Sequence, residues 1–403
     1  MKFSRKMRVS VVLLVLLTLA TVLCSCGDTF GGAEETTATE PSLLQMEPGL
    51  YDANNELVAT WDDLASKYFM DVTVSYPAYT YKTNEASPYF VLSNNEDLST
   101  GTKLVVGNVS RLGEHAFREC AQLTHIVVTD SVSVIGSYAF ANCPDLTSVE
   151  IGDKVKRIGD YVFANCASLA SVYIGNSVSE IGKDVFVGCT ALETVRLGHS
   201  IEKINENMFT DCQSLKTVEI GDGVVTIGDS AFRDCYNLAT VTFSERSQLL
   251  RIGDSAFYGC NGLEVFNVPV GVTNIGDCAF SYCRSLETIE LPSNIKSIGA
   301  YAFANCTSME SMELPNGVAS IGEGFFENCY NLRILDIPAS VVSIGSSAFF
   351  YCTELKTINY GGTMLQWNNL AENAESWGDH HEHCMIFCTD GTIAVENEQE
   401  ELN

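Results

Sequence analysis

Eleven of the sixteen cysteines recur at a fixed step along the chain. They fall every 23 residues from Cys120 to Cys235 and, after one step of 25 residues, every 23 residues again from Cys260 to Cys352. A fixed period in this range is the signature of a repeat architecture, in which each repeat is one structural unit. We therefore predict one solenoid of eleven coils over residues 109–363, in place of the several globular domains that 403 residues would otherwise suggest.

Each coil is expected to contain one short strand with a single buried face. In coil three (residues 155–177, VKRIGDYVFANCASLASVYIGNS), Val172 and Ile174 show the apolar alternation of period two that indicates such a strand. A turn follows, and in coils seven to ten it opens with proline. Proline has no N–H to donate inside a ladder, so the strand should end there. After the turn comes a second apolar pair, such as Val155 and Ile158 in coil three.

A glycine follows this second apolar pair in ten coils, and coil five has Asn205 in its place. Glycine and asparagine best tolerate a positive φ, so we predict a left-handed backbone conformation at this position. The glycines are Gly113, Gly136, Gly159, Gly182, Gly228, Gly253, Gly276, Gly299, Gly322 and Gly345. An aspartate follows in four coils (Asp160, Asp229, Asp254 and Asp277), which we interpret as the cap of a short helical turn in preference to a calcium ligand.

One phenylalanine per coil lies three residues before the repeated cysteine. These side chains are expected to stack into a buried ladder, with the cysteines on the same face: Phe117, Phe140, Phe163, Phe186, Phe209, Phe232, Phe257, Phe280, Phe303, Phe326 and Phe349. Adjacent coils are about 4.8 Å apart, close enough for disulfides, but parallel side chains disfavour them and eleven equivalent sites cannot all pair. Single cysteines also lack the C-x₂-C spacing of metal sites. We therefore favour packed thiols.

The coil pattern resembles that of the bacterial leucine-rich repeat surface proteins of the BspA type, V-x-x-I-G-x-x-A-F-x-x-C-x-x-L-x-x-[VI]-x-[IL]-P. Residues 272–292 (VTNIGDCAFSYCRSLETIELP) match it at every defining position, and the resemblance covers the whole array. It implies a leucine-rich-repeat-like solenoid of short β-strands and short helical turns, capped at both ends. It also implies a cell-surface location and a binding or adhesive role, without fixing the ligand.

The first 25 residues have the features of an export signal. Four cations precede an apolar run of 15 residues (residues 9–23), which is too short for a permanent membrane-spanning helix. The following residues resemble a lipobox, in which Ser25 precedes the cysteine that is acylated, Cys26. We predict a lipoprotein attached to the bacterial membrane by this lipid alone, with plain secretion as the alternative. Residues 26–48, rich in Gly, Thr, Glu and Pro, should form a flexible tether.

Caps are expected at both ends of the array, because a solenoid must cover its terminal coils. Residues 49–108 are assigned to the N-terminal cap, with a short helix from Trp61 capped by Thr60. Residues 364–403 are assigned to a C-terminal cap and acidic tail, and all three tryptophans lie in the two cap regions or at their edges.

Candidate ligand-binding residues lie on the outer face of the strands. Alternation predicts that one central residue per strand points to solvent, in what we call the outward row: Val127, Glu150, Tyr173, Arg196, Glu219, Thr242, Asn267, Glu290, Glu313, Asp336 and Asn359. We select as candidates Tyr173, Arg196, Glu219, Glu290, Glu313 and Asp336. The row becomes acidic towards its end, and Glu287 and Glu310 are expected to enlarge that patch, which suits a basic partner or a cation. The alternative is a solvated sheet face whose charges prevent association.

Two other segments were considered as sites. The two extra residues of the 25-residue step lie in residues 244–248 (SERSQ), which we interpret as a neutral loop in preference to a binding loop. His380, His381, His383 and Cys384, followed by Cys388, form a dense metal-capable cluster that is not H-E-x-x-H. A Zn²⁺ or Cu²⁺ site is possible there, and a polar loop is the default.

Composition excludes several functions. A chain with 46% hydrophobic and 18% charged residues has ample core material, and a formal net charge of −28 argues against nucleic-acid binding. No nucleophile with its base and no phosphate-binding glycine motif is recognisable, and a filled solenoid offers no deep pocket. We therefore expect no enzyme and no cofactor, but a monomeric adhesin for an extracellular protein or glycan. The alternatives are a structural envelope protein without a ligand and a carbohydrate-active enzyme.

Overall fold

The computed structural model describes residues 47–52, 55–60, 103–107, 109–372 and 384–395. The chain divides into two compact units, residues 1–41 and residues 42–403, and all described residues belong to the second. The export signal, Cys26 and most of the tether therefore lie outside the described residues, as do Trp61 and the helix expected after it. Thr60, its expected cap, ends strand β2 (Leu57–Thr60).

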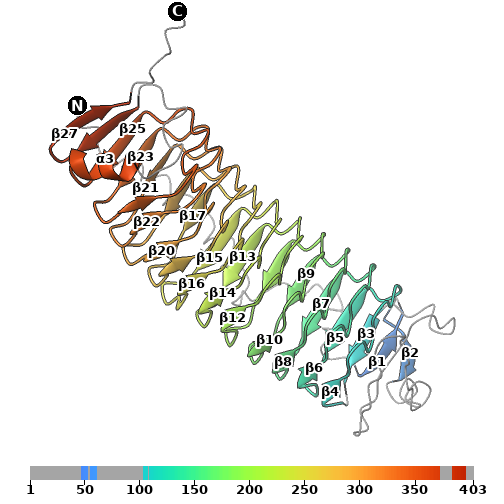
Figure 1. Ribbon diagram of the computed structural model, residues 1–403. Helices are drawn as coiled ribbons and strands as arrows, with labels where there is room; N and C mark the ends of the chain where they lie inside the picture. Colours follow the sequence, from blue (N-terminus) through green and yellow to red (C-terminus); the bar gives the residue numbers. More distant parts are fainter. Residues whose placement is uncertain (1–46, 53–54, 61–102, 108, 373–383, 396–403) are drawn as a thin grey trace, which may run out of the picture. The chain divides into compact units, whose positions relative to one another are not determined.

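The predicted strand forms in every coil, and in the described part of the chain the strands of successive coils pair in parallel except at two breaks, after coil six and after coil eight. Figure 1 shows these longer strands side by side along the array. They are β5 (His125–Val128), β7 (Ser148–Ile151), β9 (Ser171–Tyr173), β11 (Thr194–Arg196), β13 (Thr217–Ile220), β15 (Thr240–Phe243), β17 (Val265–Asn267), β19 (Thr288–Glu290), β21 (Ser311–Glu313), β23 (Ile334–Ile337) and β25 (Thr357–Tyr360). The prolines that open the turns follow these strands, as predicted.

Each coil also contains a second strand of two residues, which was not predicted, on its opposite side. This strand includes the last residue of the second apolar pair, which is Ile158 in coil three. Among the described strands, these also pair in parallel from coil to coil, in three sheets that cover coils one to four, five to nine, and ten to eleven. They are β4 (Arg111–Leu112), β6 (Val134–Ile135), β8 (Arg157–Ile158), β10 (Glu180–Ile181), β12 (Lys203–Ile204), β14 (Thr226–Ile227), β16 (Arg251–Ile252), β18 (Asn274–Ile275), β20 (Ser297–Ile298), β22 (Ser320–Ile321) and β24 (Ser343–Ile344).

The buried core runs between the two sets of strands and contains the predicted phenylalanine ladder. Ring centroids of neighbouring coils are 5.2–6.2 Å apart and the ring planes diverge by at most 19° from Phe117 to Phe349. Every ladder phenylalanine is fully buried. Burial of such side chains contributes about 1.5–3 kcal/mol each, so this ladder and its aliphatic neighbours stabilise the stack.

All eleven repeated cysteines are buried and free, which confirms the packed-thiol prediction. From Cys143 to Cys352, each thiol donates a hydrogen bond to the carbonyl oxygen of the ladder phenylalanine in the preceding coil, at 3.0–3.2 Å. The thiol therefore fills core volume and also satisfies a buried backbone acceptor.

The prediction of a left-handed backbone at the repeated glycines is wrong. Positive φ occurs two residues later, as at Tyr161, and again just before the cysteine, as at Asn165. The glycine is required for a different reason: a Cβ on Gly159 would lie 2.6 Å from the backbone nitrogen of Ser137 in the preceding coil. Close approach of two coils therefore selects glycine here.

The expected helical turns are also absent from the described coils, where these segments are hydrogen-bonded turns. The aspartates that follow the glycine bond to the next coil instead of capping their own. Asp160 Oδ1 accepts a hydrogen bond from the Lys183 N–H at 3.0 Å, and Asp277 Oδ1 accepts one from the Ala300 N–H at 2.8 Å. Each aspartate thus ties one coil to the next.

Strands and one helix extend the array at both ends. At the N-terminal end, β1 (Gly49–Tyr51) pairs antiparallel with β2 and with β3 (Lys103–Val106), and β3 pairs in parallel with β5. At the C-terminal end, α3 (Met364–Glu372) is followed by β26 (Met385–Cys388) and β27 (Gly391–Ala394). None of the described helices has the length and apolar character to cross a membrane.

Candidate functional site

The outer face of the longer strands presents two rows of side chains, because alternate strand residues point to opposite sides of a sheet. In β11, Thr194 and Arg196 are exposed and Val195 between them is buried. The third strand residue supplies the outward row, as predicted. The first strand residue supplies a second row, which in coils two to six consists only of hydroxyl side chains. We call it the hydroxyl row: Ser148, Ser171, Thr194, Thr217 and Thr240.

The first member of the outward row is not exposed, contrary to prediction. Val127 is 1% exposed and packs with Tyr51 and Val105 in a small second cluster of buried residues. Strand β3 lies beside β5 and pairs Val105 with Val127, so the cap reaches across the position that alternation alone left open. The accessible row begins with Glu150.

Three candidate ligand residues, Tyr173, Arg196 and Glu219, lie on consecutive paired strands at one register position. Glu150 precedes them in the same register. The row therefore presents an acid, an aromatic ring, a cation and a second acid, each one strand spacing of about 4.8 Å from the next.

The three acidic candidates lie further along the array and do not converge with this group. Glu313 and Asp336 are in register, and Glu290 is in register with Asn267. Across the described strands, no ladder joins β19 to β21, so Glu290 and Glu313 belong to different sheets. The enlargement expected from Glu310 is reduced, because its carboxylate lies 3.8 Å from the Arg333 guanidinium.

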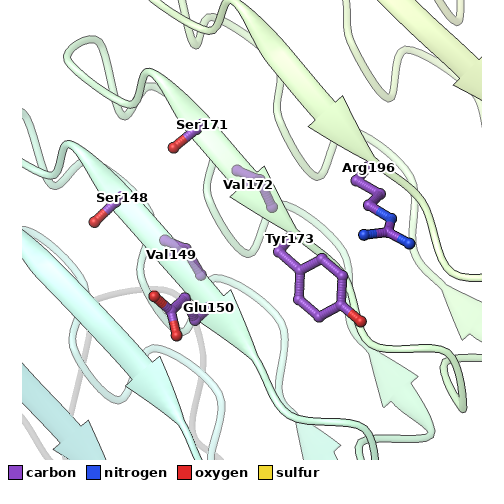
Figure 2. A pocket seen from close by; sticks show the side chains of 7 residues that line it. All are labelled: Ser148, Val149, Glu150, Ser171, Val172, Tyr173 and Arg196. Atoms are coloured by element: carbon purple, nitrogen blue, oxygen red, sulfur yellow. The ribbon is translucent and has the colours of Figure 1, made fainter. Parts of the chain in front are cut away.

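An open depression of about 470 Å³ lies on strands β7, β9 and β11. Figure 2 shows the side chains around it: Ser148, Val149, Glu150, Ser171, Val172, Tyr173 and Arg196. Three coils contribute to it, so the stacking of the repeats builds the site. Both rows take part, with Glu150, Tyr173 and Arg196 from the outward row and the two serines from the hydroxyl row.

Within the depression, the Arg196 guanidinium lies over the Tyr173 ring, with 5.6 Å between Cζ and the ring centroid. A ring face attracts a cation, so this contact holds the exposed arginine in place. Among the described residues no carboxylate lies within 4.0 Å of its nitrogens, whereas five other arginines each have such a partner. The guanidinium edge therefore keeps N–H donors for an anionic group.

Sequence reasoning missed part of this site. The strand pattern puts Glu150 in the outward row but not among the candidate ligand residues, and it does not single out Ser148 or Ser171. The signal was present in the strand pattern, because Ser148 and Ser171 lie two residues before Glu150 and Tyr173 and so share their face.

The metal hypothesis concerns residues that are mostly outside the described part. His380, His381 and His383 lie there, so the hypothesis stays a prediction. Cys384 is fully buried in the core, and burial raises the pKa of its thiol to about 11. The expected polar loop is wrong for residues 385–388, which form β26 and pair with β25. The described residues contain no group of three or more His, Cys, Asp or Glu side chains placed to hold a metal.

The insertion at residues 244–248 interrupts the main sheet. β15 pairs with β13 but, among the described strands, not with β17, which begins the next sheet. The described turn adds exposed side chains, including Arg246, without lining the depression.

These features define a class: a parallel β-solenoid whose stacked strands present an exposed face, with a depression that spans three coils. The chain belongs to the BspA type leucine rich repeat family, whose model matches in overlapping stretches at residues 100–213, 157–287 and 250–371. The fold predicted from the period is therefore confirmed, except that its turns are not helical. A search among curated proteins finds no match.

Several solved structures are similar to this chain. A leucine rich cell surface protein from Faecalibacterium prausnitzii is 28% identical over 68% of this chain and 94% of its own, with a TM-score of 0.41. A leucine-rich repeat protein from Bacteroides ovatus is 23% identical over 79% and 100%, with a TM-score of 0.43. The pneumococcal vaccine antigen PcpA is 16% identical over 72% and 85%, with a TM-score of 0.42.

Proposed function

We propose that this protein is a bacterial cell-surface lipoprotein that binds an extracellular protein or glycan through the outer face of its solenoid. The observation that carries the proposal is the depression on β7, β9 and β11, where exposed side chains of three coils converge. Membership of the BspA-type family supports a binding role for the repeats. Stacked repeats commonly use such extended faces for binding.

Surface attachment is the second part of the proposal. The apolar segment at residues 9–23 and the Ser25-Cys26 pair would direct export and acylation, and residues 26–48 would hold the array away from the membrane. Metabolic labelling with a palmitate analogue tests this part. Wild-type protein should carry the label and Cys26→Ser should not, whereas equal labelling of both would contradict anchoring at Cys26.

Ligand binding is tested with the full-length protein in detergent, presented to arrays of matrix proteins, mucins and glycans. One variant replaces Tyr173 and Arg196 with Ala, and a second replaces Glu290, Glu313 and Asp336 with Ala. All of these residues are surface residues of strands, so both variants should fold. Reduced binding in the first variant alone places the ligand on the depression, and reduced binding in the second alone places it on the acidic half. Absence of any ligand would favour a purely structural envelope protein.

The enzymatic alternative makes a different prediction. A carbohydrate-active enzyme would turn over a glycan and lose that turnover when one particular pair of carboxylates is replaced. Glu150 and Glu219 are the acids beside the depression and lie three strands apart, about 14 Å by strand spacing. The two catalytic carboxyl groups of glycosidases lie roughly 5–9.5 Å apart, whereas Tyr173 and Arg196 lie between these two acids in the row, which favours binding over hydrolysis.

A further inference from the structure

From the depression on coils two to four, we infer that its ligand is a glycan whose sugar units carry a single carboxylate, such as a uronic or sialic acid. This inference rests on the proposed binding function and narrows it. Three observations point to this chemistry: Arg196 has no carboxylate partner, acids lie on both sides of it in the outward row, and the hydroxyl row runs beside that row on the same strands.

Arg196 selects for a carboxylate. Its guanidinium is placed over Tyr173, and its remaining N–H groups can bond both oxygens of one carboxylate in parallel. Tyr173 and Glu219, its neighbours in the row, form no ion pair with it, whereas Lys216, the residue before β13, lies 2.9 Å from Glu193. Among the described residues of the two rows on β7, β9, β11 and β13, Arg196 is therefore a cation without a carboxylate partner and can bind a ligand.

Glu150 and Glu219 limit the charge of that ligand. Glu219 lies one strand spacing from Arg196, about 5 Å, which is within the Debye length of about 8 Å at physiological salt. Glu150 lies two spacings from Arg196, about 10 Å, but it lines the depression itself and so faces any ligand bound there. A second anionic group on the same unit would approach one of these acids. A sulfated polyanion is thereby disfavoured, and a sugar with one carboxylate and a neutral, hydroxyl-rich body fits.

The rest of the depression suits sugar hydroxyls. Ser148 and Ser171 present hydroxyls that both donate and accept, and Glu150 accepts. The volume of about 470 Å³ lies in the range of small-molecule sites, about 300–1,000 Å³. A peptide would more commonly add a strand to a free sheet edge, and β7, β9 and β11 are each paired on both sides.

The test measures binding of full-length protein in detergent to matched pairs of oligosaccharides by calorimetry. The pairs are a disaccharide that ends in one uronic acid with its methyl ester, and sialyllactose with lactose; heparin is the polyanion control. We expect at least one acidic member to bind about tenfold or more tightly than its neutral partner, the size expected for loss of a charge-assisted hydrogen bond. Heparin should bind no better than the neutral sugars.

Arg196→Gln should reduce binding of the acidic sugar about tenfold or more. The chain offers a matched control in Arg284, which lies over the Tyr282 ring at 5.8 Å outside the depression; Arg284→Gln should leave affinity unchanged. Equal binding of acidic and neutral sugars, stronger binding of heparin, or full binding by Arg196→Gln would each overturn the inference. If no sugar of the panel binds but a matrix protein does, the inference fails and the proposed function stands. If neither binds, both fail.

Discussion

From Cys166 to Cys352, the folded environment of each repeated cysteine raises the pKa of its thiol and so opposes ionisation. Burial raises the pKa of Cys189, Cys283 and Cys329 to about 12, whereas a thiol in an unfolded chain has a pKa of about 8.5. A folded-state pKa above the unfolded value gives stability that is complete below about pH 8.5 and is lost as the pH rises towards 12. The direction is fixed because the unfolded chain loses protons that the folded chain keeps.

We therefore predict that the free energy of unfolding falls steeply above about pH 8.5, by up to about 1.4 kcal/mol per pH unit for each thiol. Urea unfolding at several pH values between 7 and 10, under reductant, measures this slope. Cys189→Ala should be less stable at pH 7. Its free energy of unfolding should also fall less steeply with pH, because one thiol fewer releases a proton on unfolding. A pH-independent free energy in this window would mean that the thiols are not protected in solution.

The presence of glycine in the sequence does not show why glycine is needed there, because a left-handed backbone and a close contact both select glycine. The structure distinguishes them at Gly276, where an added Cβ would lie 2.2 Å from Asp254 Oδ1 and 2.6 Å from the Asp254 backbone nitrogen. We expect Gly276→Ala to lower the free energy of unfolding by about 1–3 kcal/mol, the usual range for overpacking.

Gly221 provides the control for this substitution. A Cβ there would meet its nearest atoms at 3.7 and 3.8 Å, which is ordinary van der Waals contact. Gly221→Ala should therefore be neutral or slightly stabilising, because alanine reduces the entropy of the unfolded chain. Equal destabilisation by both substitutions in urea unfolding would refute the contact argument.

At the scale of elements, the longer strand was predictable because its two alternating apolar residues, such as Val172 and Ile174, recur in coil after coil. The second strand has two residues per coil, too few for any periodicity, and its pairing comes only from stacking of the coils. The candidate site shows the same limit. The alternation along each strand predicted that Tyr173 and Arg196 face solvent. It could not predict that Glu150 and the two serines line the same depression, because that depends on the register between stacked coils.

The C-terminal cap depends on one face of helix α3. Trp367 is 1% exposed and packs edge-on against Tyr360, with ring centroids 5.4 Å apart, while Leu365 on the same helix is 70% exposed. We expect Trp367→Ala to cost about 3–5 kcal/mol, the range for a buried large aromatic side chain. Leu365→Ala should change stability by less than about 0.5 kcal/mol. Thermal unfolding followed by circular dichroism compares the two, and similar melting temperatures would show that the cap does not support the array.

At the scale of the molecule, the coils are repeated units that mainly contact their neighbours, so stability should be a sum over coils and interfaces. The phenylalanine and cysteine ladders continue through all eleven coils with nearly constant geometry. A whole coil can therefore be removed without placing any core residue on the surface, whereas removal of part of a coil shifts every later residue out of register.

Deletion of residues 306–328 removes 23 residues and joins Asn305 to Cys329, restoring the Asn-Cys pair of the parent sequence. We expect this variant to fold, with a β-rich circular dichroism spectrum, a stability lower by one coil and its interface, and unchanged binding at the distant Tyr173–Arg196 depression. Deletion of residues 306–317 removes twelve residues and places polar residues at buried positions, so it should unfold or aggregate. Equal loss of structure in both deletions would show that the coils are not interchangeable and that the array folds as a single indivisible core.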